Sequence, residues 1–349
     1  MPNLPLPPDD LAQTGKALAS PMQYPRTLGE EIGAAVVGLP SALVCLLYAG
    51  EPSLANAIRS IEKQRGVDVR FILIGNHPKR LAHERLFKTL NMFRDEHDVT
   101  LFLGADMELV PDRLLAALAG TYRQFPSIDH AILGVDDWFS GEQILGVQSW
   151  RRGVRHATDP NRLFTDVVAN SSRGKFKLAH PRTPLILHGE EPSNAQAIRY
   201  GAQRAMKAAA SGKASRWDRL ATFARSVTEE PHPKRLLALA AMDVALEDPE
   251  FGLRCISGDD PLNASDLSVL HRRAESGDLV QSLSEKVNDS ALRLSLSRER
   301  SESPADRGRP RLKYLSKVAN FSSVRSDPPP QESIEAAFYE FLAADETPV

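Results

Sequence analysis

An apolar run in the first third of the chain ends in a turn that carries acidic side chains. The run is Leu101-Phe102-Leu103, and it is followed by Gly104-Ala105-Asp106-Met107-Glu108-Leu109-Val110-Pro111-Asp112. A carboxylate at the carboxyl end of a buried strand can hold a hard divalent cation that bridges two phosphate oxygens. Asp106 is therefore the first candidate for a metal ligand, and Glu108 follows two residues later. The alternative is that Asp106 or Glu108 caps the next helix or is solvated in a loop.

The segments around this turn predict the frame that positions it. We expect strands at residues 42–48, 69–74, 99–103 and 130–135, and helices at 54–61, 81–93 and 111–122. Near-continuous apolar strands that alternate with helices are typical of a parallel sheet covered on both faces. Ligands of such sheets bind beyond the carboxyl ends of the strands, and Asp106 falls at one of these ends.

The pattern changes after residue 136. Further strands are predicted at 144–150 and 185–188, and the segments 193–210 and 214–290 have helical patterns. The terminal segment is acidic and amphipathic, so we expect a short helix that docks on the body of the protein or on a partner. We divide the chain into a leader at 1–41, an α/β domain at 42–212, a helical extension at 213–290, a linker at 291–330 and the terminal helix at 331–349.

Several short segments follow one another in a characteristic order. Tyr48-Ala49-Gly50-Glu51-Pro52 follows the first strand, Ala57-Ile58-Arg59-Ser60-Ile61 lies in the first helix, and Gly104-Ala105-Asp106-Met107-Glu108-Leu109 follows the third strand. This order resembles family 2 glycosyltransferases with the GT-A fold, over residues 42–210. The resemblance implies a GT-A-like α/β fold: a mainly parallel mixed sheet flanked by helices, here with a C-terminal helical extension. It also implies transfer of a sugar, with inversion, from a nucleotide-sugar donor to a carbohydrate or other hydroxyl acceptor.

The resemblance assigns roles at the donor site. Asp106 matches the second acid of the Asp-x-Asp motif, and Glu108 and His188 are further candidate ligands of Mn²⁺ or Mg²⁺. His188 ends the run Leu185-Ile186-Leu187, and a neutral imidazole nitrogen is a common metal ligand. The turn after the first strand would border the nucleotide through Ala49, Gly50 and Glu51. A hydrogen-bonded histidine in a turn is the plain alternative for His188.

The resemblance also places a general base in the second half of the domain. Asp166 lies in Leu163-Phe164-Thr165-Asp166, where the family has a Glu-Asp pair whose aspartate deprotonates the acceptor. Asp137 and its neighbour Asp136 are rival candidates, since they follow a strand end directly. Trp138, the next residue, could stack on a sugar ring or be half-buried.

Some positions depart from the family pattern. Gly104 stands where the first acid of Asp-x-Asp is expected, and Thr165 replaces the glutamate before Asp166. These losses motivate the alternative of a non-catalytic binding or scaffold protein with the same fold. A nucleotidyltransferase is disfavoured, because the turn after the first strand has one glycine and an acid in place of a glycine-rich basic loop.

Composition excludes several other classes. The 349 residues are 42% hydrophobic and 25% charged with a net charge of −2, so nothing indicates nucleic-acid binding. Two cysteines cannot build a disulfide framework, and the first residues do not resemble a signal peptide. Residues 32–50 carry no charge, but Gly38 and Pro40 interrupt them, so we expect a core strand there and no membrane span. We expect a cytoplasmic protein, and the sequence leaves its oligomeric state open.

Overall fold

The computed structural model describes residues 39–75, 77, 79–157, 169–170, 172, 174–179, 184–189, 192–211, 214–257, 262–289 and 329–344. The chain divides into two compact units, with the boundary between Glu191 and Pro192. The sheet unit holds the described residues up to 189 together with the terminal helix. The helical unit holds the described residues from 192 to 289.

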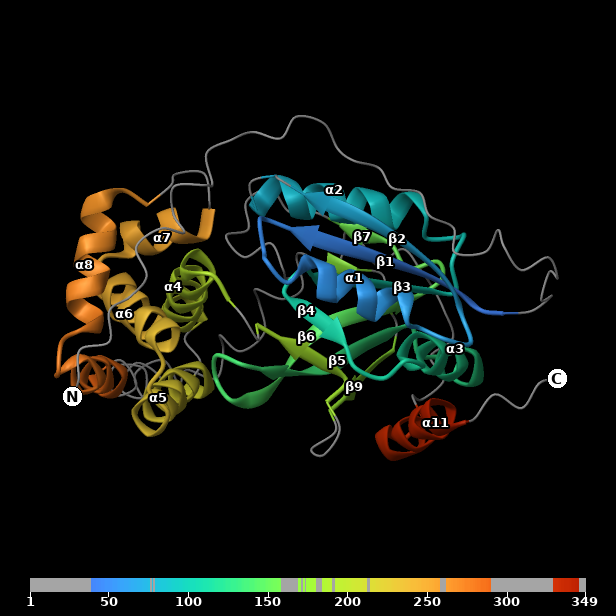
Figure 1. The fold of residues 1–349 in the computed structure, drawn as a ribbon. Coiled ribbons are helices and arrows are strands. Elements are labelled where there is room, and N and C mark those ends of the chain that lie inside the picture. Colours follow the sequence, from blue (N-terminus) through green and yellow to red (C-terminus); the bar gives the residue numbers. More distant parts are fainter. Residues whose placement is uncertain are drawn as a thin grey trace, which may run out of the picture. The chain divides into compact units, whose positions relative to one another are not determined.

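The sheet unit is built on one mixed sheet (Figure 1). Its strands are β1 (Ser41–Tyr48), β2 (Asp68–Gly75), β3 (Val99–Gly104), β4 (Met107–Leu109), β5 (His130–Asp137), β6 (Glu142–Arg151), β9 (Lys175–Leu178) and β10 (Ile186–His188). Their order is β2-β1-β3-β6-β5-β10-β4, and β9 pairs with the first half of β5. A separate pair joins β7 (His156–Ala157) and β8 (Ala169–Asn170).

The direction of the strands decides where their ends meet. β1 is parallel to β2 and β3, whereas β6 is antiparallel to both β3 and β5. β10 is parallel to β5 and antiparallel to β4. It follows that β1, β3, β5 and β10 all run in one direction, and their carboxyl ends lie along the same edge of the sheet.

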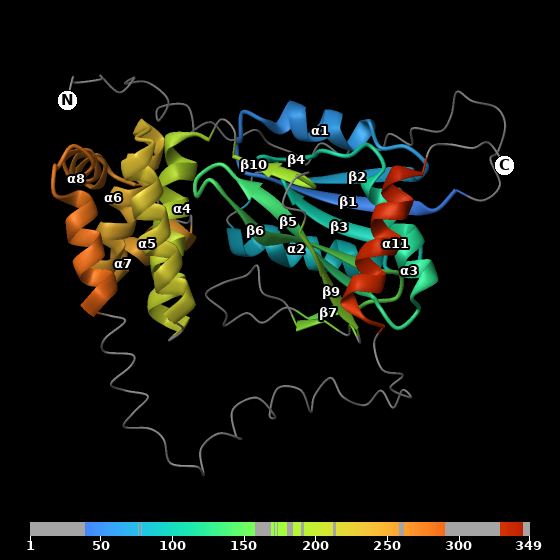
Figure 2. The ribbon, with the colours of Figure 1, turned by 90° about the horizontal axis from the view of Figure 1, so that it is seen from below.

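Helices cover both faces of this sheet (Figure 2). α1 (Leu54–Glu62), α3 (Leu114–Gln124) and α11 (Gln331–Ala343) pack on one face, and α2 (Lys79–Met92) packs on the other. The terminal helix α11 therefore docks on the body, with Ile334 and Phe338 buried in the core beside α3. A Cβ atom at Gly120 of α3 would lie 2.8 Å from the Phe341 ring, so the absence of a side chain there lets the two helices approach.

The predicted α/β class, with a mixed sheet flanked by helices and helices after it, is confirmed. One helix start differs in detail from expectation. The helix expected from Pro111 begins at Leu114, and the Gln64 side chain bonds to Pro111 O (2.8 Å) and to the Leu115 amide (3.1 Å) across the turn before it. Before α1, the Ser53 side chain makes no cap bond and donates its hydroxyl to the Ala105 carbonyl at 3.1 Å.

The helical unit packs around one buried helix. Its helices are α4 (Asn194–Ser211), α5 (Ala214–Glu229), α6 (Pro233–Glu247), α7 (Pro249–Ser257), α8 (Ala264–Ala274) and a further helix over 279–289. Almost all of residues 237–245 in α6 are buried apolar residues, as expected for a helix surrounded by others. The exception is Asp243, whose fully buried carboxylate pairs with Arg273 at 2.9 Å and with Lys286.

We expect Gly201→Ala to destabilise the helical unit. A Cβ atom at Gly201 of α4 would lie 1.9 Å from the Ala238 carbonyl oxygen of α6, so the two helices would have to separate. Helix propensity alone predicts a gain of about 0.5–1 kcal/mol for this change. Overpacking opposes that gain, and we expect a net loss of about 1–3 kcal/mol in the free energy of unfolding, measured by chemical denaturation. Gly277→Ala, which meets nothing within 4 Å, is the matched control; equal effects would contradict the packing argument.

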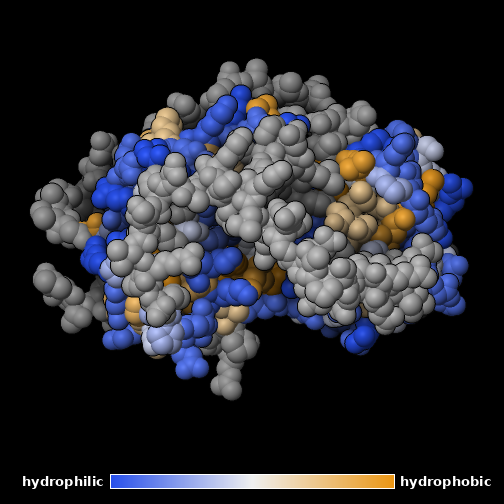
Figure 3. Space-filling view, turned by 180° about the vertical axis from the view of Figure 1, so that it is seen from behind, coloured by the Kyte–Doolittle hydropathy of each residue, from blue (hydrophilic) through white to orange (hydrophobic). Residues whose placement is uncertain are grey.

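Among the described helices, none combines the length and the apolar character needed to cross a membrane. In the described part of the uncharged stretch, residues 41–48 form β1. On the face seen in Figure 3, hydrophilic residues cover much of the coloured surface and apolar residues form smaller patches.

Two buried histidines lie against Trp150 in the core beneath α2. The His130 ring stacks on the indole at 5.5 Å, and the His156 ring meets it edge-on at 4.5 Å. Burial lowers the pKa of His130 to about 4, and Lys175 acts in the same direction. Burial likewise lowers the pKa of His156 to about 4, with a further contribution from His130. Both rings are therefore neutral in the folded protein at pH 7.

We expect the sheet unit to lose stability as the pH falls from 6.5 toward 4. The folded pKa values of His130 and His156 lie below the ordinary 6.5, so the unfolded chain binds more protons in this window. Their contribution is fully present above pH 6.5 and is lost as the pH falls through the folded values. Denaturation at a series of pH values should show a shallower fall in His156→Gln than in the wild type. The control His271→Gln, on α8, should keep the wild-type slope; an unchanged slope in His156→Gln would refute the assignment.

Candidate active site

Three chemistry-bearing residues meet at the carboxyl edge of the sheet. Asp106 lies in the turn between β3 and β4, Asp137 is the last residue of β5, and His188 is the last residue of β10. His188 is paired in register with Asp137 on one side and with Met107, next to Asp106, on the other. The short strand β4 therefore brings the turn after β3 back against β10. We call Asp106, Asp137 and His188 the His188 cluster.

Both ring nitrogens of His188 face a carboxylate. Nδ1 lies 2.8 Å from Asp137 Oδ1, and Nε2 lies 3.3 Å from Asp106 Oδ2. The Asp137 side chain is 0% exposed, whereas His188 and Asp106 keep 14% and 20% exposure. Asp137 Oδ2 accepts the Ser140 hydroxyl at 2.8 Å and the Ser140 amide at 3.2 Å. The cluster is thus anchored at Asp137 and reaches solvent at Asp106.

The two carboxylates set the charge of the imidazole. Burial by itself lowers the pKa of His188, but the charges and hydrogen bonds of Asp106 and Asp137 outweigh it and raise the pKa to about 10. At pH 7 the ring is therefore a cation held between two anions. A metal ion that binds Nε2 has to displace its proton, because only an unprotonated nitrogen can be a ligand.

Backbone bonds fix the turns that carry the cluster. The Gly189 amide donates to the Asp106 carbonyl at 2.9 Å, and the Trp138 amide donates to the His188 carbonyl at 3.0 Å. Gly189 has φ +76°, a conformation that favours glycine. At Gly104 a Cβ atom would lie 2.5 Å from Asp106 Oδ1. The absence of a side chain at Gly104 therefore leaves room for the Asp106 carboxylate in its present position.

The turn after β1 lies beside the Asp106 turn. The Ala105 amide donates to the Leu47 carbonyl at 2.8 Å, and the Ser53 hydroxyl donates to the Ala105 carbonyl. Within this turn the Ala49 amide donates to the Glu51 carboxylate. Gly50 has φ +100° and open space in front of it. The three residues expected to border a nucleotide, Ala49, Gly50 and Glu51, thus lie on a turn bonded directly to the residue before Asp106.

Other candidates lie elsewhere. Glu108 is paired with Leu187, one residue out of step with the pair of Met107 and His188, so it occupies the opposite face of the β4–β10 pair. Asp136 is likewise on the opposite face from Asp137, and its Oδ1 accepts a hydrogen bond from Gln143 at 2.8 Å. Neither position places a carboxylate beside His188. Asp166 lies outside the described residues.

Asp137 occupies a position that opposes the predicted role of general base. A base must come within hydrogen-bond reach of the acceptor hydroxyl. The Asp137 side chain is fully buried, and its oxygens are engaged by His188 and Ser140. Ser140 and Gly189 are residues that the sequence analysis missed. Two local sequence patterns could have indicated them: a serine three residues after an aspartate, and a glycine directly after a strand.

The His188 cluster offers a divalent cation only part of the ligands that it needs. Within the ranges that the structure describes, no group of three or more His, Cys, Asp or Glu side chains is arranged to hold a metal ion. Asp106 and His188 supply two donor atoms 3.3 Å apart, while Asp137 holds the far nitrogen of the ring, as carboxylates behind metal-bound histidines do. A cation here would need further oxygen ligands from water or phosphate, which is how Mg²⁺ is commonly bound.

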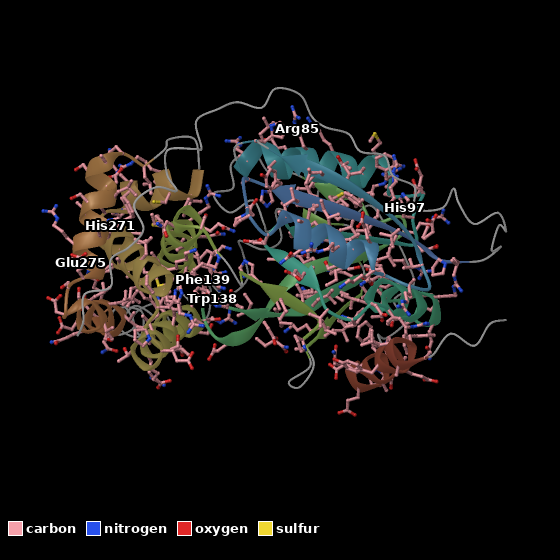
Figure 4. The ribbon with its side chains drawn as sticks, in the orientation of Figure 1. Arg85, His97, Trp138, Phe139, His271 and Glu275 are labelled. Atoms are coloured by element: carbon pink, nitrogen blue, oxygen red, sulfur yellow. The ribbon has the colours of Figure 1, made fainter. Side chains whose placement is uncertain are left out.

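Two aromatic residues, Trp138 and Phe139, follow Asp137 in the chain; Figure 4 labels both. The Trp138 and Phe139 rings meet edge-on at 5.3 Å, and Phe139 lies 6.5 Å from the His188 ring. Phe139 is buried, and Trp138 is partly exposed. The buried Phe139 ring therefore lies beside the His188 ring of the cluster.

No protein-family model matches the sequence, and no curated protein matches it. Among solved structures the chain is similar to the mannosyltransferase PcManGT from Pyrobaculum calidifontis in complex with GDP-Man and Mn²⁺. The identity is 11% and the TM-score 0.32, over 76% of this chain and 89% of that chain. It is also similar to S. aureus TarS, with 10% identity and a TM-score of 0.29, over 74% of this chain and 55% of that chain. Both likenesses are weak.

Proposed function

We propose that this chain is a glycosyltransferase that moves a sugar from a nucleotide-sugar donor to a hydroxyl acceptor, assisted by Mn²⁺ or Mg²⁺. The observation that carries the proposal is the His188 cluster, with Asp106 Oδ2 and His188 Nε2 3.3 Å apart at the carboxyl edge of the sheet. The residue order, which resembles family 2 glycosyltransferases, supports it independently. The turn that holds Glu51 adjoins this cluster and would border the nucleotide.

In this proposal Asp106 and His188 hold the cation and Asp137 positions His188. Asp137 fixes the ring through Nδ1, so Nε2 stays directed at Asp106. When bound, the cation neutralises charge on the departing diphosphate. The acceptor oxygen forms a bond to the anomeric carbon while the bond from that carbon to the diphosphate breaks. Asp166 is the proposed acceptor of the hydroxyl proton, and a single displacement of this kind inverts the anomeric centre.

The second candidate is a protein that binds a ligand at the same edge without catalysis. Gly104 favours it, since one acid of the expected pair is missing and its space is filled by the Asp106 carboxylate. The two candidate functions predict different turnover of a nucleotide sugar, but both predict that it binds. A protein that only binds would retain a nucleotide sugar without cleaving it.

Donor cleavage tests the proposal. The full chain is incubated with a panel of nucleotide sugars and Mn²⁺, with and without hydroxyl acceptors, and release of nucleoside diphosphate is measured. We expect release for at least one donor, loss of release with chelator, and no loss in Glu108→Gln. Binding of a donor without release in any combination would favour the second candidate, and absence of both would refute the first.

A further inference from the structure

The outward side of α2 combines exposed cations with exposed apolar side chains. Among the side chains of this helix that the structure describes, the exposed ones are Arg80, Leu81, Arg85, Lys88 and Met92. Leu81 and Met92 keep 39% and 66% exposure. The single acid within α2 is Glu84, and its carboxylate pairs with Arg80 at 3.5 Å. The exposed side of the helix is therefore cationic and apolar, and its one acid is paired.

Four of these residues form one stripe along the helix. Leu81, Arg85, Lys88 and Met92 follow one another at intervals of four, three and four residues, which places them on the same side of an α-helix. Leu81 and Met92 stand at the two ends, about 16 Å apart along the axis, and the two cations lie between them. We call these four residues the α2 stripe.

The opposite side of α2 holds the helix on the sheet. The residues buried there are Leu86, Phe87 and Leu90. Figure 2 shows α2 as the outer layer on its face of the sheet. Leu81 and Met92 do not belong to the core beneath the helix, and Met92 is the most exposed large apolar side chain in the described part of the chain. Packing of the sheet unit therefore does not explain the apolar residues of the α2 stripe.

The cations of the stripe keep their charge exposed. Arg85, which Figure 4 labels, has its Nη1 atom 2.6 Å from Nε2 of His77 in the loop before α2. Burial and the charge of Arg85 both lower the pKa of His77, so this ring is neutral at pH 7. Among the described residues, no carboxylate pairs with Arg85 or Lys88. The stripe is thus locally positive, although the whole chain has a net charge of −2.

The composition of the α2 stripe matches that of a helix at a lipid–water interface. A single exposed apolar side chain needs no explanation on a protein surface. Interfacial helices combine apolar side chains, which enter the boundary of headgroups and acyl chains, with cations that attract anionic lipids. The stems of Lys and Arg are themselves apolar, so their charged ends can contact phosphates while the helix lies at that boundary.

We propose that the α2 stripe binds the surface of an anionic membrane. Leu81 and Met92 insert beside the headgroups, and Arg85 and Lys88 contact lipid phosphates. Charge complementarity favours this occupant, because two unpaired cations meet a surface of phosphates. A fluid surface also adapts to a single outward helix, whereas a protein partner would need a groove with acids at matching positions. Binding of this kind requires no spanning helix, and it does not depend on the His188 cluster.

Vesicle co-sedimentation of the full chain tests the proposal. The probes are vesicles of phosphatidylcholine alone and vesicles in which about one third of the lipid is phosphatidylglycerol, which makes the surface anionic. We expect binding to the anionic vesicles that weakens as salt is added. Binding to the neutral vesicles should be at least about 10-fold weaker, because the attraction of the two cations is lost.

Two double variants separate the contributions of charge and apolar contact. Arg85→Gln/Lys88→Gln should weaken binding to anionic vesicles about 25-fold, since each cation at such a surface contributes about a fivefold factor. Leu81→Gln/Met92→Gln should weaken it at least about 10-fold, because these side chains would no longer leave water with a gain in free energy. All four side chains are exposed, and denaturant unfolding checks that both variants are folded.

Matched variants on the helical unit serve as controls. Arg219→Gln/Arg225→Gln removes two exposed cations of α5 and changes the net charge by the same amount. Leu253→Gln/Val269→Gln replaces two apolar residues of α7 and α8 that are 41% and 38% exposed. Both controls should bind anionic vesicles as the wild type does.

The outcomes decide between the possible occupants. Weaker binding in both α2 variants, with wild-type binding in both controls, supports the proposal. Loss in the cation variant alone would assign this side of α2 to an acidic protein or another polyanion, and loss in the apolar variant alone would remove the preference for anionic lipid; either result would overturn the proposal. Wild-type binding in all variants, equal loss in the controls, or no binding by the wild type would also overturn it.

Discussion

Asp106→Asn is expected to remove the metal dependence of this protein. In the wild type, nucleoside diphosphate should bind more tightly with Mn²⁺ than with chelator, because Asp106 and His188 offer two donor atoms 3.3 Å apart. A neutral amide is a much poorer ligand for a hard dication than a carboxylate. The variant should show equal binding with and without metal, and donor turnover should fall at least about 100-fold, since cation stabilisation of the leaving group contributes several kcal/mol.

Two matched variants make this result specific. Glu108→Gln changes an acid two residues away on the opposite face of the β4–β10 pair. Asp112→Asn changes a half-exposed acid that pairs with Arg65. Both should keep the wild-type response to Mn²⁺ in titration calorimetry. An undiminished response in Asp106→Asn would remove Asp106 from the site, and loss of the response in Glu108→Gln would move the ligand to Glu108.

Asp166→Asn is expected to slow turnover by about 10²–10⁴-fold while donor binding stays nearly unchanged. The amide keeps the shape of the side chain but cannot accept a proton, so the loss falls on the chemical step. Turnover and donor affinity are measured on the same preparation, with acceptor present. The proposal for Asp166 rests on its place in the residue order, between Asp106 and His188.

Asp136 and Asp137 provide the comparison for this experiment. Asp136→Asn should turn over normally, because the side chain bonds to Gln143 on the opposite face from the cluster. Asp137→Asn should weaken the metal response as well as turnover, since Asp137 positions His188. Replacement of a general base would lower turnover without weakening the metal response. Normal turnover in Asp166→Asn would therefore refute its role, and a pure turnover loss in Asp137→Asn would transfer the role to Asp137.

The sequence predicted the strands of the sheet better than their arrangement. β1, β2 and β3 are near-continuous apolar runs between turn residues, so local pattern alone locates them. β4 has three residues, too few for any periodicity to show. The insertion of β6 between β3 and β5, antiparallel to both, depends on pairing between distant segments and leaves no local signal.

The candidate site, like the sheet, could be predicted from the sequence only in part. The rule that ligands meet beyond the carboxyl ends of strands predicted that Asp106 and His188 would share a site, and the structure brings them together. The partnership of Asp137 with His188 could not be predicted, because it depends on the register of β10 against β5. The separation of Glu108 from the cluster has the same cause, since one residue of register moves a side chain to the other face.

The most direct test of the account is a crystal structure of the full chain with Mn²⁺ and a nucleoside diphosphate. The account predicts an anomalous manganese peak in bonding distance of both an Asp106 oxygen and His188 Nε2, about 2.0–2.6 Å for the oxygen. It also predicts diphosphate oxygens on the same ion and the nucleoside against the turn of Ala49, Gly50 and Glu51. A nucleotide bound at this edge without manganese on Asp106, or manganese and nucleotide bound elsewhere on the protein, would contradict it.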